Sequence, residues 1–462
     1  MVKKWFRYLR LRPFDISTEA GRSDERYRLV LWSIAASLFS KGLALLVMLL
    51  SVSWTLPYLG AERFGAWMTI ASFVSMLIFL DLGIGNALTN HVAAAHANAA
   101  AIANPGLLSD RISGGLGLVF IVGVFASLLL SALVAVLPWA RIIKVQDPLV
   151  QREIADALFL FAVLFGISLF SNGVHRVFAG LQRSFEAHVA AAIGSLFSIL
   201  TLAAAAENHA DVATLLLSTL GWQSASSVLL LFLLIKRRQL RLRGIGAAIQ
   251  ASKAPLLKTG GLFFVLQIGT MVGWGADSVI IASTLGAAQV AIYSVAQRLF
   301  QLVSIPLSIA NAPLWSAYAN ANACNDRQFI RTTFITNIVI TASAAIFGCF
   351  VLLAFGQVIV MWWTKDALAV PIALLVVFAV WTVLETLGNA LAMMLNGCSI
   401  VREQVVTVVV LTVLALPAKL VFVNLFGVEG MIAVYIILYC AVVLIFYGFV
   451  FRSNIMAKMS QS

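Results

Sequence analysis

The sequence predicts an all-α integral membrane protein with twelve transmembrane helices, arranged as two six-helix lobes that are related by a parallel repeat around a central cavity. Three observations lead to this fold class. Hydrophobic residues make up 61% of the 462 residues, charged residues only 11%, and the mean hydropathy is +0.99. Such a chain has too little polar surface to cover a water-soluble globule. Its apolar residues gather in long runs, and two segments half a chain apart resemble each other.

Twelve apolar runs are long enough to cross a membrane, since a hydrocarbon core of about 30 Å needs roughly 20 mostly apolar residues. In order, the runs cover residues 29–56, 64–93, 114–138, 154–179, 187–206, 212–235, 259–283, 289–319, 331–356, 367–396, 404–425 and 429–451. The connections between them are short, and none is large enough to form a soluble domain with its own core. The function is therefore expected to reside in the membrane bundle.

A repeat divides the chain into two lobes. The segments "LGAERFGAW" (59–67) and "LGAAQVAIY" (285–293) align at an offset of 226, and each joins the first and second helix of a six-helix set. Because six is even, both sets have the same orientation, and substrate sites of such transporters lie between the halves. We therefore predict a basic interfacial segment (1–28), an N-lobe (29–235), a basic linker (236–258), a C-lobe (259–451) and a tail (452–462).

Basic residues in the connections predict the orientation. With both termini in the cytoplasm, the cytoplasmic side carries 22 Lys and Arg residues and the opposite side five. Cytoplasmic flanks carry such an excess. The net charge of +12 is explained by this topology and by attraction to anionic headgroups, so no nucleic-acid partner is expected.

Motifs for cofactor, metal or nucleotide chemistry are not found in the sequence. The four cysteines form no CxxC, the five histidines form no HExxH, and there is no GxxxxGK[ST] loop. We expect no cofactor, no metal and no ATP hydrolysis. A membrane glycosyltransferase or polymerase would need an acidic catalytic loop or a large exoplasmic loop, and neither is visible, so an enzyme is not expected.

One hairpin resembles a known family. The segment "LGAERFGAWMTIASFVSMLIFLDLGIGNALTN" (59–90), with the looser "GLQRSFEAH" (180–188) and "GWGADSVIIASTLGAAQVAIYSVAQRLF" (273–300), is similar to the Wzx-type polysaccharide flippases. This resemblance implies the multidrug/oligosaccharidyl-lipid/polysaccharide exporter (MOP) superfamily. It also implies a carrier in the bacterial inner membrane that flips undecaprenyl-diphosphate-linked oligosaccharides to the periplasmic leaflet for O-antigen (lipopolysaccharide) or exopolysaccharide synthesis. An ion-coupled drug exporter of the same superfamily is the alternative, because fold alone does not decide function.

Ionisable residues inside the runs are the first candidate site residues, because a charge in a membrane helix usually faces a cavity or a partner. Lys41 and Arg298 are candidates for lining the cavity and binding the substrate diphosphate. Asp81, Asp277 and Glu385 are candidates for coupling to a proton or sodium ion, although Glu385 and Lys419 also suit structural roles. Asp277 and Arg298 lie at similar depth on neighbouring helices, so they form either a permanent ion pair or one that opens when Arg298 binds the diphosphate.

Asp81, Asn86 and Asn90 form a second candidate group near the inner end of the second run. Gly83 and Gly85 stand between them and favour close helix approach or a local break. A gate on the cytoplasmic face needs such residues, but the two asparagines also suit a simple helix exit with Asp81 paired to a neighbouring helix. The sequence leaves both interpretations open.

Overall fold

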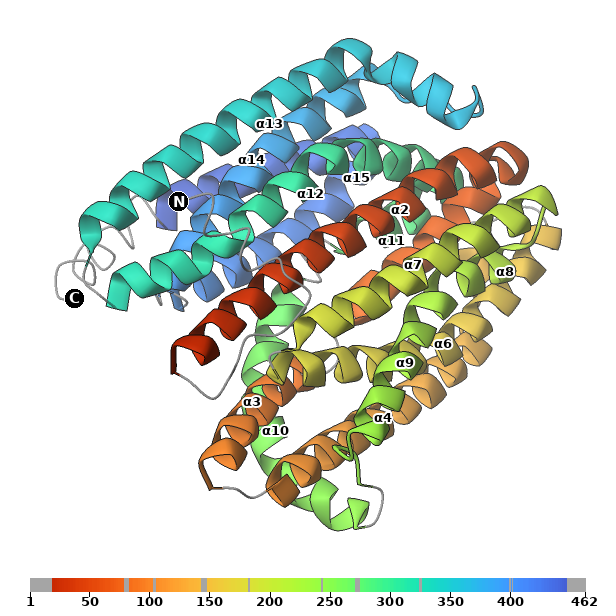
Figure 1. Ribbon diagram of the computed structural model, residues 1–462. Coiled ribbons are helices and arrows are strands. Elements are labelled where there is room, and N and C mark those ends of the chain that lie inside the picture. Colours follow the sequence, from red (N-terminus) through yellow and green to blue (C-terminus); the bar gives the residue numbers. More distant parts are fainter. Residues whose placement is uncertain are drawn as a thin grey trace. The chain divides into compact units, whose positions relative to one another are not determined.

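The computed structural model describes residues 19–78, 83–102, 105–142, 148–181, 183–241, 244–270, 275–323, 326–398, 400 and 402–446, and these form helices with no strand among them. Figure 1 shows the helices, most of which are long. Their bounds are α2 (Glu19–Ile78), α3 (Ile84–Ile102), α4 (Pro105–Val136), α5 (Trp139–Ile142), α6 (Pro148–Gly180), α7 (Ser184–Glu207), α8 (Val212–Leu216), a π-helical turn η1 (Leu217–Gly221), α9 (Trp222–Lys236), α10 (Ile245–Thr270), α11 (Asp277–Leu285), α12 (Ala287–Ala323), α13 (Arg327–Thr364), α14 (Ile372–Gly397) and α15 (Arg402–Ile445).

The helices account for the twelve predicted runs. Within the described ranges, nine helical segments are long and apolar enough to cross a membrane. The first of these, Ala35–Ser72, covers most of the first run and the beginning of the second, which are separated by the non-helical Gly60, and the second run continues into α3. Glu403–Ile445 covers the eleventh run and most of the twelfth, which are separated by the non-helical Gly427. The seventh run is divided between α10 and α11. α10 already begins at Ile245, so much of the predicted linker 236–258 is helical.

The two repeated Leu-Gly segments have the same backbone conformation. Gly60 has φ 72° and ψ 172°, and Gly286 has φ 94° and ψ 166°. This region of the Ramachandran map is essentially restricted to glycine, because a Cβ clashes with the backbone there. At the second turn, α11 packs against α12 across Gly286 alone. The repeat that the sequence shows is therefore also present in the local structure.

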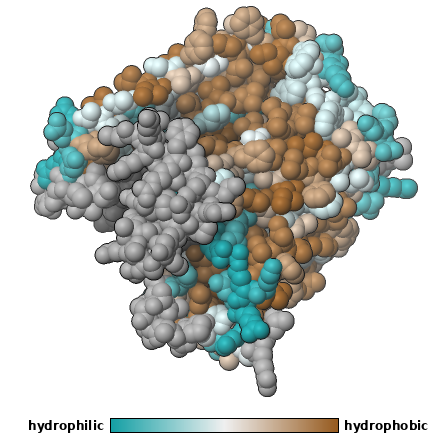
Figure 2. Space-filling view, viewed as in Figure 1, coloured by the Kyte–Doolittle hydropathy of each residue, from teal (hydrophilic) through white to brown (hydrophobic). Residues whose placement is uncertain are grey.

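The outer surface of the helices is strongly apolar. On α4, Phe125 and Leu128 are both 66% exposed, and on α13 Phe347 is 70% exposed. Figure 2 shows hydrophobic side chains over much of the described surface in that view. Exposed apolar area of this extent needs a lipid environment.

The chain divides into two compact units, and we describe each by itself. Unit 1 contains the residues up to Ser51, Leu77–Trp139 and Arg152–Gln267; unit 2 contains Val52–Met76, Ala140–Gln151 and the residues from Ile268. Unit 1 has a core of apolar side chains from α3, α4, α6, α7, α9 and α10. Unit 2 has smaller clusters, among them one around Tyr435 of α15. These boundaries differ from the predicted lobes, whose division stays a prediction.

Candidate functional site

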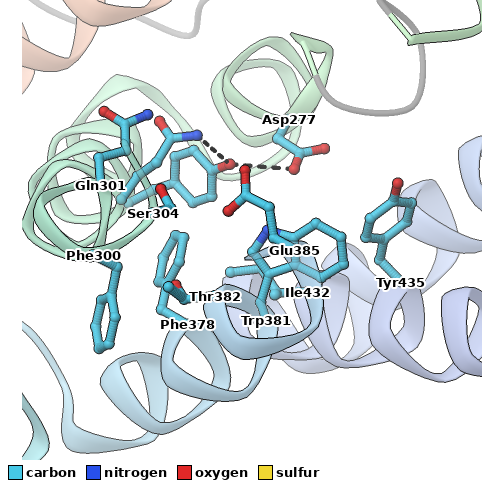
Figure 3. A pocket seen from close by; sticks show the side chains of 12 residues that line it. Asp277, Phe300, Gln301, Ser304, Phe378, Trp381, Thr382, Glu385, Ile432 and Tyr435 are labelled. Carbon is cyan, nitrogen blue, oxygen red and sulfur yellow. Dashed lines mark hydrogen bonds between the residues drawn. The ribbon is translucent and has the colours of Figure 1, made fainter. Parts of the chain in front are cut away.

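Unit 2 contains a polar cavity of about 230 Å³ between α11, α12, α14 and α15. Figure 3 shows its side chains. Aromatic rings form a large part of the wall: Tyr293, Phe300, Phe378, Trp381 and Tyr435. The rings also pack on one another, since the Trp381 and Tyr435 centroids are 5.0 Å apart and those of Phe300 and Phe378 are 6.0 Å apart. This packing makes the wall a fixed surface.

Asp277, at the start of α11, forms a buried ion pair with Lys419 of α15. The Lys419 Nζ lies 2.5 Å from Oδ1 of Asp277, and the two side chains are 1% and 15% exposed. The ammonium also lies 4.0 Å from the centroid of the Tyr435 ring, a cation–π contact. The hydroxyl of Tyr293 donates to Oδ2 of Asp277 at 3.2 Å, and Gln297 donates to that hydroxyl at 3.3 Å. Asp277 is thus neutralised within the protein.

Glu385 of α14 is the second carboxylate of this cavity. Its side chain is partly buried and makes no hydrogen bond or ion pair with any described residue, and in Figure 3 it points toward Asp277 and the side chains of α12. Gln301 and Ser304 of α12 likewise have no hydrogen-bond partner among the described residues. A smaller cavity of about 150 Å³ adjoins, because it shares these three residues and continues to Asn389.

Unit 1 contains a cavity of opposite character, about 370 Å³ in volume, between α2, α6, α7 and the segment from η1 to α9. Lys41, His175 and Arg176 line it together with Asn172 and six serines, and none of the described residues that line it is acidic. Basic and hydroxyl groups are the donors that bind phosphate oxygens.

Hydrogen bonds inside unit 1 hold this cavity together. Ser168 of α6 and Ser224 of α9 are joined at 2.8 Å, and Ser226 of α9 lies 3.5 Å from Nε2 of His175. At the end of α9, Arg237 binds Glu186 at 2.7 Å, and Arg183 binds the same carboxylate at 2.6 Å. The shared partner places the two arginines on the same side of the membrane. That this side is the cytoplasm stays a prediction.

The candidates for binding the substrate headgroup are in different surroundings. Lys41 lines the cavity of unit 1. Arg298, on α12 in unit 2, donates from Nη2 to the Sδ of Met68 of α2 at 2.9 Å. The ion pair that the structure gives Asp277 is with Lys419, which the sequence did not connect with Asp277. The roles of Lys41, Arg298, Asp277 and Glu385 in transport stay predictions.

The predicted gate residues are described only in part. Asp81 lies outside the described residues, and Asn86 and Asn90 belong to α3, with only their backbone described. Gly83 has φ 67° between the end of α2 and the start of α3. This conformation agrees with the local break that was one of the two expectations for the glycines.

Sequence reasoning missed the polar stripes that line both cavities. On α12, the sequence spaces Tyr293, Gln297, Gln301, Ser304 and Ser308 three or four residues apart inside an apolar run. Residues at this spacing lie on one face of a helix. On α6, polar side chains follow the same spacing at positions 168, 171, 172 and 175. A search for polar periodicity within apolar runs would have identified both faces.

The family follows from a comparison of the sequence. The model of a protein family described as polysaccharide biosynthesis protein matches residues 28–318 of this chain. The chain belongs to this polysaccharide biosynthesis protein family. A comparison with curated proteins found no match to this chain. The resemblance to polysaccharide flippases of the MOP superfamily is confirmed at this level.

The fold of this family member is similar to that of solved transporters. An inward-facing multidrug resistance MATE family transporter of the MOP superfamily matches with a TM-score of 0.73 and 17% identity, over 92% of this chain and 99% of that chain. An outward-facing MATE family transporter of the same superfamily matches with a TM-score of 0.65 and 16% identity, over 93% of this chain and 96% of that chain. A MOP superfamily transporter from Pyrococcus furiosus Vc1, described as having a binding pocket of reverse polarity, matches with a TM-score of 0.64 and 16% identity, over 93% of this chain and 96% of that chain.

Family and fold together define the general class of this protein. The predicted all-α membrane fold is confirmed, and it is the fold of the solved transporters named above. The protein is therefore a multi-pass membrane protein of the polysaccharide biosynthesis protein family, and its fold is similar to that of transporters of the MOP superfamily.

Proposed function

We propose that the protein flips undecaprenyl-diphosphate-linked oligosaccharide repeat units from the cytoplasmic to the periplasmic leaflet of a bacterial inner membrane. It works by alternating access and serves the synthesis of a surface polysaccharide, such as O-antigen or exopolysaccharide. Both termini lie in the cytoplasm. Membership of the polysaccharide biosynthesis protein family supports this proposal.

The cavity of unit 1 is the observation that carries the proposal. A lipid diphosphate is a multiply charged anion, and its binding inside a membrane needs basic groups without competing carboxylates. Lys41 and Arg176 meet that need, and the surrounding serines donate hydrogen bonds to phosphate oxygens. In this proposal the guanidinium of Arg176 holds two oxygens of the diphosphate and Lys41 neutralises the remaining charge.

The direct test is flipping by the purified full chain in proteoliposomes. A fluorescent undecaprenyl-diphosphate oligosaccharide is inserted, and the fraction that becomes inaccessible to a membrane-impermeant quencher is followed over time. Absence of flipping by the wild-type protein would refute the proposal. Lys41→Ala and Arg176→Ala should each weaken the binding of inorganic pyrophosphate at least about tenfold, because the first removes one hydrogen bond to a charged group and the second removes two. Lys236→Ala, which removes an exposed lysine at the end of α9, is the matched control and should leave pyrophosphate binding unchanged.

An ion-coupled exporter of small molecules or drugs is the second candidate function. The aromatic and acidic cavity of unit 2 favours it, because aromatic rings and carboxylates attract organic cations. Glu385, or Asp277 after release from Lys419, would then carry the coupling proton or sodium ion. Efflux of ethidium from energised vesicles, abolished by Glu385→Gln, would support this alternative over the flippase.

The gate on the cytoplasmic face stays part of the proposal. Asp81, Asn86 and Asn90 are the residues proposed to control it. Asp81→Asn or Asn86→Leu should slow flipping while the amount of protein in the membrane is kept. Full flipping activity in both variants would contradict the gate.

A further inference from the structure

The cavity of unit 2 has a chemistry that does not suit the diphosphate. It contains two carboxylates, and one of them, Asp277, is already neutralised by Lys419. The remaining carboxylate, Glu385, gives the cavity a net negative character that repels an anion. The part of the substrate that binds here must therefore be uncharged or positively charged.

The polar groups of this cavity have unused hydrogen-bonding capacity. Glu385, Gln301 and Ser304 find no partner among the described residues, and Ser304 is only 8% exposed. Polar groups in such surroundings normally have a partner, either a ligand or ordered water. Together they offer the cavity carboxylate, amide and hydroxyl groups from α12 and α14, which both donate to and accept from hydroxyl groups.

The aromatic side chains of this cavity argue for an organic ligand over a metal ion. Phe378 and Trp381 present aromatic surface to the same cavity. The described residues contain no group of three or more His, Cys, Asp or Glu side chains that could hold a metal ion. Aromatic surface combined with a few convergent polar groups is typical of sites for small organic molecules. A sugar ring has this dual character, with hydroxyl groups around its edge and C–H groups on its faces.

We propose that the cavity of unit 2 is a sugar-binding subsite, which takes a neutral or amino-bearing sugar of the oligosaccharide and rejects a uronic acid. This inference rests on the proposed function and adds the class of sugar to it. Glu385 and Gln301 bind the ring hydroxyls, and the aromatic wall covers one face of the ring. A carboxylate on the sugar meets Glu385, and two like charges at close range exclude it.

The experiment measures sugar binding without the lipid or the diphosphate. Purified full-length protein in lipid nanodiscs is titrated with N,N′-diacetylchitobiose as the neutral probe and with digalacturonate as the acidic probe, and binding is followed by saturation-transfer NMR. Chitobiose should bind, and digalacturonate should bind at least tenfold more weakly. Glu385→Gln and Gln301→Leu should each weaken chitobiose binding roughly tenfold, as expected for one lost hydrogen bond. Glu385→Gln should also narrow the difference between the two probes.

Matched controls separate a local effect from misfolding. Gln357→Leu removes an exposed glutamine of α13 and should leave chitobiose binding unchanged. Binding of inorganic pyrophosphate, the probe for the cavity of unit 1, should be the same in Glu385→Gln and in the wild type. A variant that loses pyrophosphate binding as well has a folding defect and is replaced by Gln301→Asn, which is expected to weaken chitobiose binding alone.

Three results would overturn the sugar subsite. Chitobiose binding that is equal in the wild type and both cavity variants would do so, as would digalacturonate binding as tight as chitobiose. The third result is that ethidium binds in a way that depends on Glu385 and chitobiose does not bind at all. This result would assign the cavity to organic cations. Failure of the proposed function is a separate result, since it appears as absent flipping and absent pyrophosphate binding whatever chitobiose does.

Discussion

Replacing Lys419 by methionine is expected to destabilise unit 2, because it removes the cation that neutralises Asp277. Removal of one partner from a buried ion pair typically costs about 3 to 5 kcal/mol, since the other charge stays buried. Tyr293 still donates to the second oxygen of Asp277 at 3.2 Å, and the Asp277 side chain is 15% exposed. These contacts favour the lower end, about 3 kcal/mol. Methionine keeps most of the side-chain volume, so this loss reflects charge more than packing.

The loss is measured as the midpoint of thermal unfolding of the purified protein in detergent, followed by tryptophan fluorescence. At about 2 °C per kcal/mol for a large domain, Lys419→Met should lower the midpoint by roughly 6 °C. Adding Asp277→Asn should restore at least half of this loss, because no unpaired charge then remains.

The control is Arg237→Met, at an ion pair whose side chains are 28% and 16% exposed. Such partly exposed pairs contribute at most about 1 kcal/mol. The reasoning is refuted if Lys419→Met lowers the midpoint no more than this control does. It is also refuted if the double variant simply adds the losses of its two single variants.

Three further predictions concern the backbone and the topology. Gly286→Ala should lower the free energy of unfolding by about 1 to 3 kcal/mol, because φ is 94° there. Its control is Gly246→Ala on α10, where a Cβ meets nothing within 4 Å, and this variant should leave the unfolding midpoint unchanged or raise it. Gly65→Ala should lower that midpoint, since its Cβ would lie 1.7 Å from a carbonyl oxygen at the start of α12 and α2 must move away; a midpoint equal to the wild type would contradict this close packing. Reporter fusions at Lys144 and Ala247 should lie on opposite sides of the membrane, and the same side for both would refute the twelve-span topology.

Most of the fold could be predicted from hydropathy, and the Leu-Gly repeat indicated two of the turns, but hydropathy alone did not give the length of the connections. The composition and the runs predict the membrane helices correctly, because a chain in lipid must satisfy its backbone within helices. Hydropathy falls at Glu62 and Arg63, so the sequence suggests a connection of several residues there, whereas the helix is interrupted at Gly60 alone. Charged residues lower the hydropathy without breaking the hydrogen bonds of the helix backbone. A glycine at positive φ interrupts the helix but changes the hydropathy little.

The ionisable residues of the site could be predicted from the sequence, but the residues that they pair with could not. Lys41 and Glu385 could be predicted because charges in apolar runs are costly, and each lines a cavity. Depth along neighbouring helices predicts Arg298 as the partner of Asp277, but depth does not fix which way a side chain faces around the helix. Its observed partner, Lys419, is 142 residues away in the sequence, and only the packing of α15 against α11 brings the two together.

The reversal between α11 and α12 also limits how this protein can be handled at the bench. Only Gly286 separates the two helices, so a protease, an antibody or an inserted epitope tag finds almost no backbone there. The connection between α13 and α14 is different: it runs from Lys365 to Pro371 outside any helix, and its first three residues are exposed. Insertions are tolerated best at exposed loop positions. Ala367 is exposed and Gly286 is buried, so Ala367 is the better position for a tag.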